Sequence, residues 1–200
     1  MKTFKVNIRM FLEQFPSEGR QHGWIEVICG SMFSGKTEEL IRRLKRVEFA
    51  KQKLLLFKPR IDDRYHEENV VSHKGSSFQA IPVDSSKEIL TLWKKERIVA
   101  IDEAQFFDTD LPEVCSELAK NGVRVIIAGL DMDYLGKAFG PMPQLLCQAE
   151  YVTKVHAICV SCGNLAQFSH RTEKTDGQVL VGAVEKYQPL CRSCYNKISH

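Results

Sequence analysis

Short apolar runs along the chain alternate with segments whose apolar residues recur at the helical period. The runs at 25–29, 54–57, 98–101 and 123–127 have the length of strands, and Gly30 ends the first of them. We therefore expect four strands in the first two thirds of the chain.

Helical patterns fill the gaps between these runs. Apolar residues recur on one face over 37–51, and helical patterns return at 87–95 and 111–120. The polar segment 61–77 contains a glycine and no clear period, so we expect a loop there. Strands that alternate with helices predict an α/β fold in which helices cover both faces of a parallel sheet.

The pattern changes near Tyr151, where short β-prone pieces and paired cysteines replace the alternation. We place a domain boundary there, with an α/β domain over 23–150 and a smaller, zinc-ribbon-like module over 151–200. Residues 1–22 form an N-terminal extension to which we assign no structure.

Composition and charge narrow the function classes. The net charge of +3, from 28 basic and 25 acidic residues, does not by itself indicate a nucleic-acid partner. No apolar run approaches the ~20 residues of a membrane span, and the basic N-terminus lacks the apolar core of a signal peptide. We therefore expect a cytoplasmic protein whose seven cysteines are reduced, which favours metal binding over disulfides.

A phosphate-binding motif follows the first run directly. The residues Gly30-Ser31-Met32-Phe33-Ser34-Gly35-Lys36-Thr37 fit the pattern G-x-x-x-x-G-K-S/T. Glycines let such a loop curl its N–H groups towards phosphate oxygens, and the next helix directs its positive dipole end at the same anion. Lys36 would reach the β- and γ-phosphates, and Thr37 would hold Mg²⁺. The position between a predicted strand and a predicted helix favours a nucleotide site over a plain glycine turn.

Two acidic residues, Asp102 and Glu103, follow the run at 98–101. The carboxyl ends of parallel strands face the crevice where ligands bind, so Asp102 suits a second Mg²⁺ contact through water. Neighbouring strand residues point to opposite sides, which leaves Glu103 open to another role. In a kinase that role is the base for the attacking hydroxyl; in an ATPase it is to polarise water. Two solvated acids at a strand end are the plain alternative.

Two C-x-x-C pairs, Cys159 with Cys162 and Cys191 with Cys194, lie in the C-terminal module. Two such pairs complete a Cys₄ zinc site, and the long gap between them predicts a sizeable loop. A redox pair and buried thiols are the alternatives. A redox C-x-x-C pair usually lies in a βαβ unit, and neither pair here does.

Aromatic residues and one arginine are weaker candidates. Phe106, Phe107, Tyr134 and Phe139 would suit an apolar slot for a flat base, although aromatic residues belong more often to the core. Arg64 would place charge on a transferring phosphoryl group, or it is an ordinary solvated side chain.

Together these motifs resemble the small, zinc-containing (type II) thymidine kinases of bacteria and animal cytosol over residues 24–196. The matching pieces are 32–37, Asp62-Asp63-Arg64-Tyr65, Ile101-Asp102-Glu103-Ala104-Gln105-Phe106-Phe107, Gly129-Leu130-Asp131, Phe139-Gly140-Pro141-Met142-Pro143, both cysteine pairs, and Val181-Gly182 through Tyr187. Tyr134 stands where many relatives have Phe.

This resemblance implies transfer of the γ-phosphate of ATP to the 5′-hydroxyl of thymidine or deoxyuridine, with Mg²⁺ as cofactor and Glu103 as the base. The nucleoside site that it implies is lined by Met32, Asp62, Arg64, Phe106, Leu130, Tyr134 and Phe139. A lid loop would cover the base through Val179, Val181, Gly182 and Val184, with Tyr187 packed on it. One structural Zn²⁺ per chain, a homotetramer, feedback inhibition by dTTP and a role in nucleotide salvage are implied as well.

Two other functions fit part of the pattern. Residues 102–105 look like the Mg²⁺ motif of a helicase, which would make the chain a nucleic-acid-dependent ATPase with a zinc ribbon. A translocating helicase needs a second α/β lobe, for which 200 residues leave no room. A zinc-ribbon protein with a vestigial P-loop is the other alternative, and the intact Lys36, Thr37, Asp102 and Glu103 argue against it. We expect a kinase with neither nucleic acid nor membrane as a partner.

Overall fold

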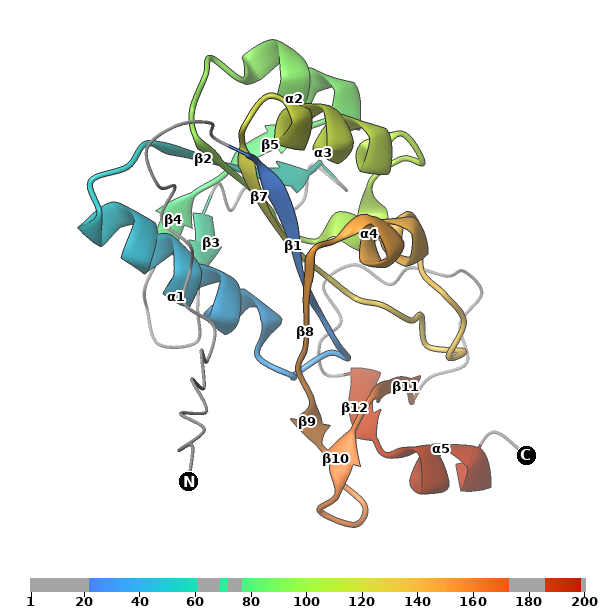
Figure 1. Ribbon diagram of the computed structural model, residues 1–200. Helices are drawn as coiled ribbons and strands as arrows, with labels where there is room; N and C mark the ends of the chain where they lie inside the picture. Colours follow the sequence, from blue (N-terminus) through green and yellow to red (C-terminus); the bar gives the residue numbers. More distant parts are fainter. Residues whose placement is uncertain (1–21, 61–68, 72–76, 173–185, 199–200) are drawn as a thin grey trace, which may run out of the picture.

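The computed structural model describes residues 22–60, 69–71, 77–172 and 186–198, and a parallel sheet of six strands lies at its centre (Figure 1). The strand order is β5-β2-β6-β7-β1-β8, and every pairing is parallel. The strands are β1 (Trp24–Cys29), β2 (Leu54–Pro59), β5 (Ile81–Val83), β6 (Ile98–Ile101), β7 (Arg124–Gly129) and β8 (Tyr151–Lys154). All four predicted strands are present in this sheet.

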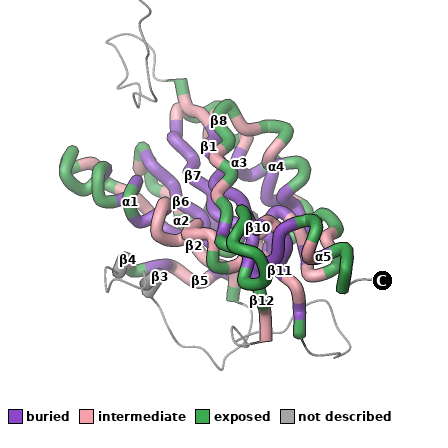
Figure 2. Tube along the Cα trace, turned by 90° about the horizontal axis from the view of Figure 1, so that it is seen from below, coloured by how far each residue is buried: buried purple, intermediate pink, exposed green. Residues whose placement is uncertain are grey.

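Helices cover both faces of the sheet, as predicted. The helix α1 (Lys36–Phe49) lies on one face, and α2 (Ser86–Leu92), α3 (Leu111–Lys120) and α4 (Met142–Gln148) lie on the other. Figure 2 shows the buried strands between α1 on one side and α3 with α4 on the other.

Strand alternation explains why both faces are apolar. In β7, Val125 and Ile127 pack with α3 and α4, whereas Ile126, between them, packs with α1. Helix α1 needs only one apolar stripe, which consists of Leu40, Ile41, Leu44 and Val47.

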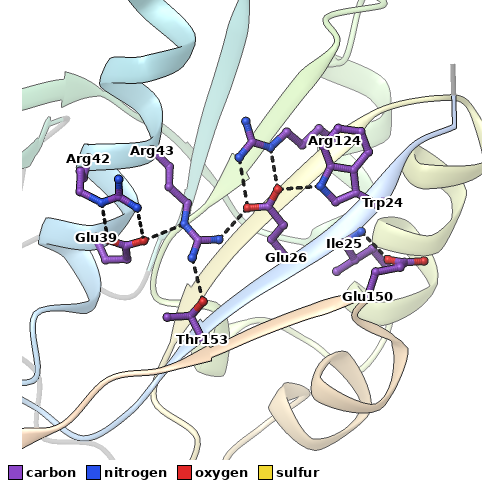
Figure 3. Close-up of polar contacts among 9 residues, drawn as sticks. All are labelled: Trp24, Ile25, Glu26, Glu39, Arg42, Arg43, Arg124, Glu150 and Thr153. Carbon is purple, nitrogen blue, oxygen red and sulfur yellow. Dashed lines mark hydrogen bonds and ion pairs between the residues drawn. The ribbon is translucent and has the colours of Figure 1, made fainter. Parts of the chain in front are cut away.

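A buried charged network fastens α1 to the sheet (Figure 3). Arg43 of α1 donates from Nη1 to Oε2 of Glu26 on β1 (2.6 Å) and from Nη2 to Oγ1 of Thr153 on β8 (2.9 Å). Glu26 Oε1 accepts from Nε of Arg124 (2.7 Å) and from Nε1 of Trp24 (2.6 Å). Burial alone would raise the pKa of Glu26, but the surrounding hydrogen bonds and positive charges outweigh burial and hold that pKa below its usual value.

The segment 61–77 was predicted to be a loop, but its described residues, 69–71 and 77, belong to strands. Two strands, β3 (Asn69–Val71) and β4 (Ser77–Gln79), pair antiparallel within or at the edge of it. Strands of three residues are too short for an alternating pattern to stand out, which is why the sequence did not indicate them.

The C-terminal module consists of two small hairpins and a helix. The first hairpin pairs β9 with β10, the second pairs β11 with β12, and α5 follows. Their bounds are β9 Ala157–Ile158, β10 Leu165–Ala166, β11 Phe168–Arg171, β12 Tyr187–Leu190 and α5 Arg192–Ile198. Figure 1 shows this module at the end of the sheet where β1 finishes.

The large sheet extends past the boundary that we placed at Tyr151, because β8 pairs with β1 as far as Lys154. We propose that the division between the α/β domain and the C-terminal module falls after Lys154. Within the described residues, no helix has the length and apolar character needed to cross a bilayer.

Candidate active site

The predicted phosphate loop connects β1 to α1, which begins at Lys36. No side chain fits at Gly30, because a Cβ there would lie 2.2 Å from the carbonyl oxygen of Val155. Ser34 donates from Oγ to the carbonyl oxygen of Ser31 (2.7 Å), and Lys36 Nζ donates to the same oxygen (2.8 Å). The loop is therefore a tight turn between a buried strand and a helix N-terminus, the context that the motif requires.

The acidic pair lies at the same edge of the sheet as this loop. Strand β7 lies between β6 and β1, so the carboxyl ends of β6 and β1 are one strand apart. Burial lowers the pKa of Lys36, and the carboxylates of Glu103 and Asp102 act against burial. The loop lysine is thus within electrostatic reach of both acids.

Asp102 is buried, and burial followed by the charge of Glu103 raises its pKa to about 7. A divalent cation beside the carboxylate reverses this effect, because the cation favours the charged form. Asp102 therefore suits the predicted Mg²⁺ contact.

Glu103 is exposed, but strand alternation does not separate it from Asp102 as we expected. Both residues lie beyond β6, and Glu103 adopts left-handed backbone angles, φ 53° and ψ 39°, directly before the 3₁₀ turn η1 (Ala104–Phe106). The backbone at Glu103 therefore follows a left-handed turn and not the pleat of a strand. The conformation is uncommon for a residue with a side chain.

Gln105, to which the sequence gave no role, contacts this acid. Its Nε2 donates to Oε2 of Glu103 (2.5 Å), and its Oε1 accepts from the backbone N–H of Leu130 (2.8 Å). The motif containing Gln105 had been singled out by resemblance, but nothing local indicates a contact with a residue 25 positions away.

Of the predicted nucleoside contacts, Phe106, Phe139 and Leu130 lie around Gln105. Phe106 and Phe139 pack edge to face, with ring centroids 5.4 Å apart and an interplanar angle of 87°. The edge-to-face pair and the backbone of Leu130 are thus neighbours of Gln105, whose amide contacts Glu103.

Tyr134 and Met32 instead contact the C-terminal module. The guanidinium of Arg171 lies 3.6 Å from the centroid of the Tyr134 ring, and the Tyr195 hydroxyl donates to the Tyr134 carbonyl (2.9 Å). The backbone N–H of Met32 donates to Oγ of Ser169 (2.9 Å). Sequence reasoning missed Ser169, Arg171 and Tyr195, because no local motif marks them.

The structure places Tyr187 in β12, where it pairs with Arg171. The remaining predicted contacts lie outside the described residues: Asp62, Arg64, Val179, Val181, Gly182 and Val184.

The four predicted zinc ligands meet in one cluster. The Sγ atoms of Cys159, Cys162, Cys191 and Cys194 all lie within 4.8 Å of one another. Tetrahedral bonds of ~2.3 Å would place the sulfurs ~3.8 Å apart, and the Cys162 and Cys191 sulfurs are 3.5 Å apart, so small shifts of the side chains accommodate the ion. The residues therefore fit a closed Cys₄ metal site.

The thiols of this cluster differ in acidity. Backbone hydrogen bonds, that of Cys191 first, lower the pKa of Cys159 to about 6. The sulfurs of Cys162 and Cys191 raise the pKa of Cys194 to about 12. Four thiolates at this spacing repel one another unless a cation lies among them, and a soft set of four sulfurs suits zinc.

Comparison with known proteins decides the family. A family model described as thymidine kinase matches residues 23–195. The chain belongs to the thymidine kinase family. This confirms the resemblance carried by the motifs and the prediction of an ATP-dependent nucleoside kinase.

Relatives in the thymidine kinase family are similar along nearly the whole chain. A thymidine kinase of Bacteroides thetaiotaomicron is 61% identical over 186 residues, which cover 93% of this chain and 94% of the relative. One of Porphyromonas gingivalis is 54% identical over 188 residues, which cover 94% and 92%. Among solved structures, a genome packaging NTPase of Sulfolobus turreted icosahedral virus 2 has a TM-score of 0.42 at 16% identity, over 66% of this chain and 74% of that one.

Membership of the thymidine kinase family also bears on the alternatives. A nucleic-acid-dependent ATPase and a binding protein with a vestigial P-loop each explain only part of the chain. The family match spans the phosphate loop, the acidic pair and both cysteine pairs.

Proposed function

We propose that this chain transfers the γ-phosphate of ATP to the 5′-hydroxyl of thymidine, and also of deoxyuridine, and so forms dTMP by nucleotide salvage for DNA synthesis. The observation that carries the proposal is the position of the phosphate loop and the acidic pair at one edge of the sheet, where the charges of Glu103 and Asp102 act on Lys36. In a chain of the thymidine kinase family, that edge brings a phosphate site and a candidate base together.

Each group has a distinct role in this proposal. The backbone of residues 30–37 binds the phosphates of ATP, and Lys36 places its charge on the β- and γ-phosphates. Thr37 and Asp102 hold Mg²⁺, which neutralises charge on the phosphates. Arg64 adds positive charge at the transferring group.

Glu103 accepts the proton of the 5′-hydroxyl while the hydroxyl oxygen attacks the γ-phosphorus. The bond from that phosphorus to the bridging oxygen breaks, and ADP leaves with the electron pair. The exposure of Glu103 supports this role, since a base must be reached by the substrate hydroxyl.

The nucleoside lies, in this proposal, between the wall of Phe106, Phe139 and Leu130 and the lid loop. Met32 and Tyr134 complete the pocket on the side of the C-terminal module, and Asp62 and Arg64 close it from the segment after β2. Tyr187 and the backbone of Val179, Val181, Gly182 and Val184 cover the base.

One Zn²⁺ per chain, held by the four cysteines, stabilises the module that carries the lid. The module contacts the phosphate loop through Ser169 and the pocket through Arg171. The role of the metal is thus to hold these contacts in place, since structural zinc contributes folding energy.

We further propose a cytoplasmic homotetramer that is inhibited by dTTP. The support for these three properties is the family resemblance. Size-exclusion chromatography with light scattering tests the tetramer, and activity measured against dTTP concentration tests the inhibition.

The kinase is separated from its alternatives by ATP consumption measured with thymidine, with DNA and with neither. We expect consumption only with thymidine, matched by an equal amount of dTMP. Consumption stimulated by DNA would support the nucleic-acid-dependent ATPase, and ATP consumption under none of the conditions would support the vestigial P-loop.

A further inference from the structure

The side chain of Gln105 bridges the candidate base and the end of β7. Gln105 is 2% exposed, and its amide makes two hydrogen bonds of opposite polarity. Oε1 accepts from the N–H of Leu130 (2.8 Å), and Nε2 donates to Oε2 of Glu103 (2.5 Å). A backbone N–H offers only a donor, so the amide oxygen must face Leu130 and the amide nitrogen must face Glu103.

The surroundings of Gln105 hold this amide in place. A Cβ at Gly140 would lie 2.2 Å from the carbonyl oxygen of Gln105, and one at Gly129 would lie 3.0 Å from its Oε1. Two glycines therefore let the chain after β7 close directly on Gln105. The side chain has little room to change rotamer.

Glu103 by itself lacks such support. It is exposed, and an exposed glutamate loses side-chain entropy when it is held in one orientation. Its backbone is fixed by the left-handed turn and by the hydrogen bond from its own N–H to Oδ1 of Asp102 (3.0 Å). The Gln105 amide fixes the side-chain carboxylate as well, because it donates a hydrogen bond to one of the two carboxylate oxygens of Glu103.

We propose that Gln105 is a positioning residue that holds Oε2 of Glu103, so that Oε1 is presented to the nucleoside hydroxyl in one orientation. The same amide links that orientation to Leu130 in the wall of the nucleoside pocket. Recognition of the thymine ring and acceptance of the 5′-hydroxyl proton by Glu103 are thereby joined through the side chain of Gln105. This inference rests on the proposed function, in which Glu103 is the base.

The test uses Gln105→Glu, which keeps the length of the side chain and an acceptor for the Leu130 N–H but replaces the donor to Glu103 by a carboxylate of like charge. We expect kcat for thymidine to fall about 10- to 100-fold, the effect of losing one hydrogen bond to a charged group. The KM for thymidine should change less than about twofold, because the Leu130 contact remains. Gln105→Met removes both hydrogen bonds and should lower kcat similarly while it raises that KM.

A double-mutant cycle distinguishes positioning from plain structural support. Because the amide acts through Glu103, adding Gln105→Glu to Glu103→Gln should lower kcat no further. The same double variant reverses donor and acceptor, so its melting temperature should return towards the parent value while its kcat does not. A further independent loss of kcat in the double variant would contradict the proposal.

A parent-like kcat in folded Gln105→Glu overturns the inference. If Gln105→Glu does not fold, a parent-like kcat in Gln105→Met overturns it instead. The Glu103→Gln variant separates this failure from failure of the proposed function. If Glu103→Gln retains the parent rate, the assignment of the base is wrong and the inference falls with it. If Glu103→Gln is slow while Gln105→Glu is not, only the positioning role is wrong.

Discussion

The backbone N–H of Met32 donates a hydrogen bond to the Oγ of Ser169, 2.9 Å away. Met32 lies in the phosphate loop, and Ser169 lies in β11 of the C-terminal module, 137 residues later. This bond gives the cysteine-bearing module a direct contact with the loop that we propose to bind ATP.

Ser169→Ala should therefore weaken ATP binding. Loss of a single hydrogen bond of this kind costs about 1 kcal/mol, or roughly fivefold in Kd. Isothermal titration with a non-hydrolysable ATP analogue measures the change, and zinc content should stay as in the parent. Ser161→Ala, at an exposed serine of the same module, is the matched control. An unchanged Kd for Ser169→Ala would show that the contact does not support the loop.

Metal removal should loosen the C-terminal module before the α/β domain. We expect one zinc per chain by elemental analysis, and Cys191→Ser should lose the metal, lower the melting temperature and weaken thymidine binding, because zinc binding contributes folding energy. The control is Cys147→Ser, since Cys147 is exposed and outside the cluster. Protein prepared without chelators that contains no zinc would contradict the assignment.

Gly140→Ala should disturb the wall of the proposed nucleoside pocket. Gly140 has φ +48°, and an added Cβ would lie 2.2 Å from the Gln105 carbonyl oxygen, so the change adds a clash to backbone strain. Gly163→Ala isolates the strain, because Gly163 has φ +75° but nothing lies within 4 Å of its added Cβ. The melting temperature and the affinity for thymidine should fall clearly more for Gly140→Ala than for Gly163→Ala. Equal losses in the two variants would rule out the close approach of Gly140 to the Gln105 carbonyl oxygen as the cause.

Glu26→Gln should destabilise the fold strongly at neutral pH. The substitution removes the carboxylate that the buried guanidinium groups of Arg43 and Arg124 share, although Arg43 keeps its ion pair with Glu39, and breaking a buried pair in this way typically costs about 3–5 kcal/mol. Urea unfolding measures the loss. Glu113→Gln, at an exposed helical position, should change the free energy of unfolding by about 1 kcal/mol or less.

The effect of Glu26→Gln on the free energy of unfolding should also depend on pH. The pKa of Glu26 is lower in the folded protein than its ordinary value of 4.5, so the unfolded chain binds the proton more readily. The stability from this carboxylate is complete above the unfolded pKa and is lost as pH falls through the folded pKa. The difference between parent and Glu26→Gln should therefore shrink below about pH 4.5. A difference that stays constant down to the acid transition would show that the charge is not the cause.

Long periodic segments were predictable from sequence, and contacts across the fold were not. The helix at 111–120 begins and ends where its apolar stripe predicts, because local periodicity and burial coincide there. The Glu26 network was not predictable, since a charged residue inside an apolar strand has no local sign of its distant partners.

In the candidate site as well, some residues were predictable from sequence and others were not. Residues 30–37 and the four cysteines were found because their chemistry requires fixed spacing along the chain. The backbone angles of Glu103 and its contact with Gln105 depend on how β6, β7 and the following turns pack. Those features required the structure.

The most direct test of the account is single-turnover transfer from γ-labelled ATP to thymidine in the parent and in Glu103→Gln, with thymidine affinity measured on both. The variant is nearly isosteric, so thymidine and Mg²⁺·ATP should bind as in the parent. The transfer step should slow ~10²–10⁴-fold, because an amide cannot accept the 5′-hydroxyl proton. Transfer at the parent rate by Glu103→Gln would contradict the assignment of Glu103 as the base.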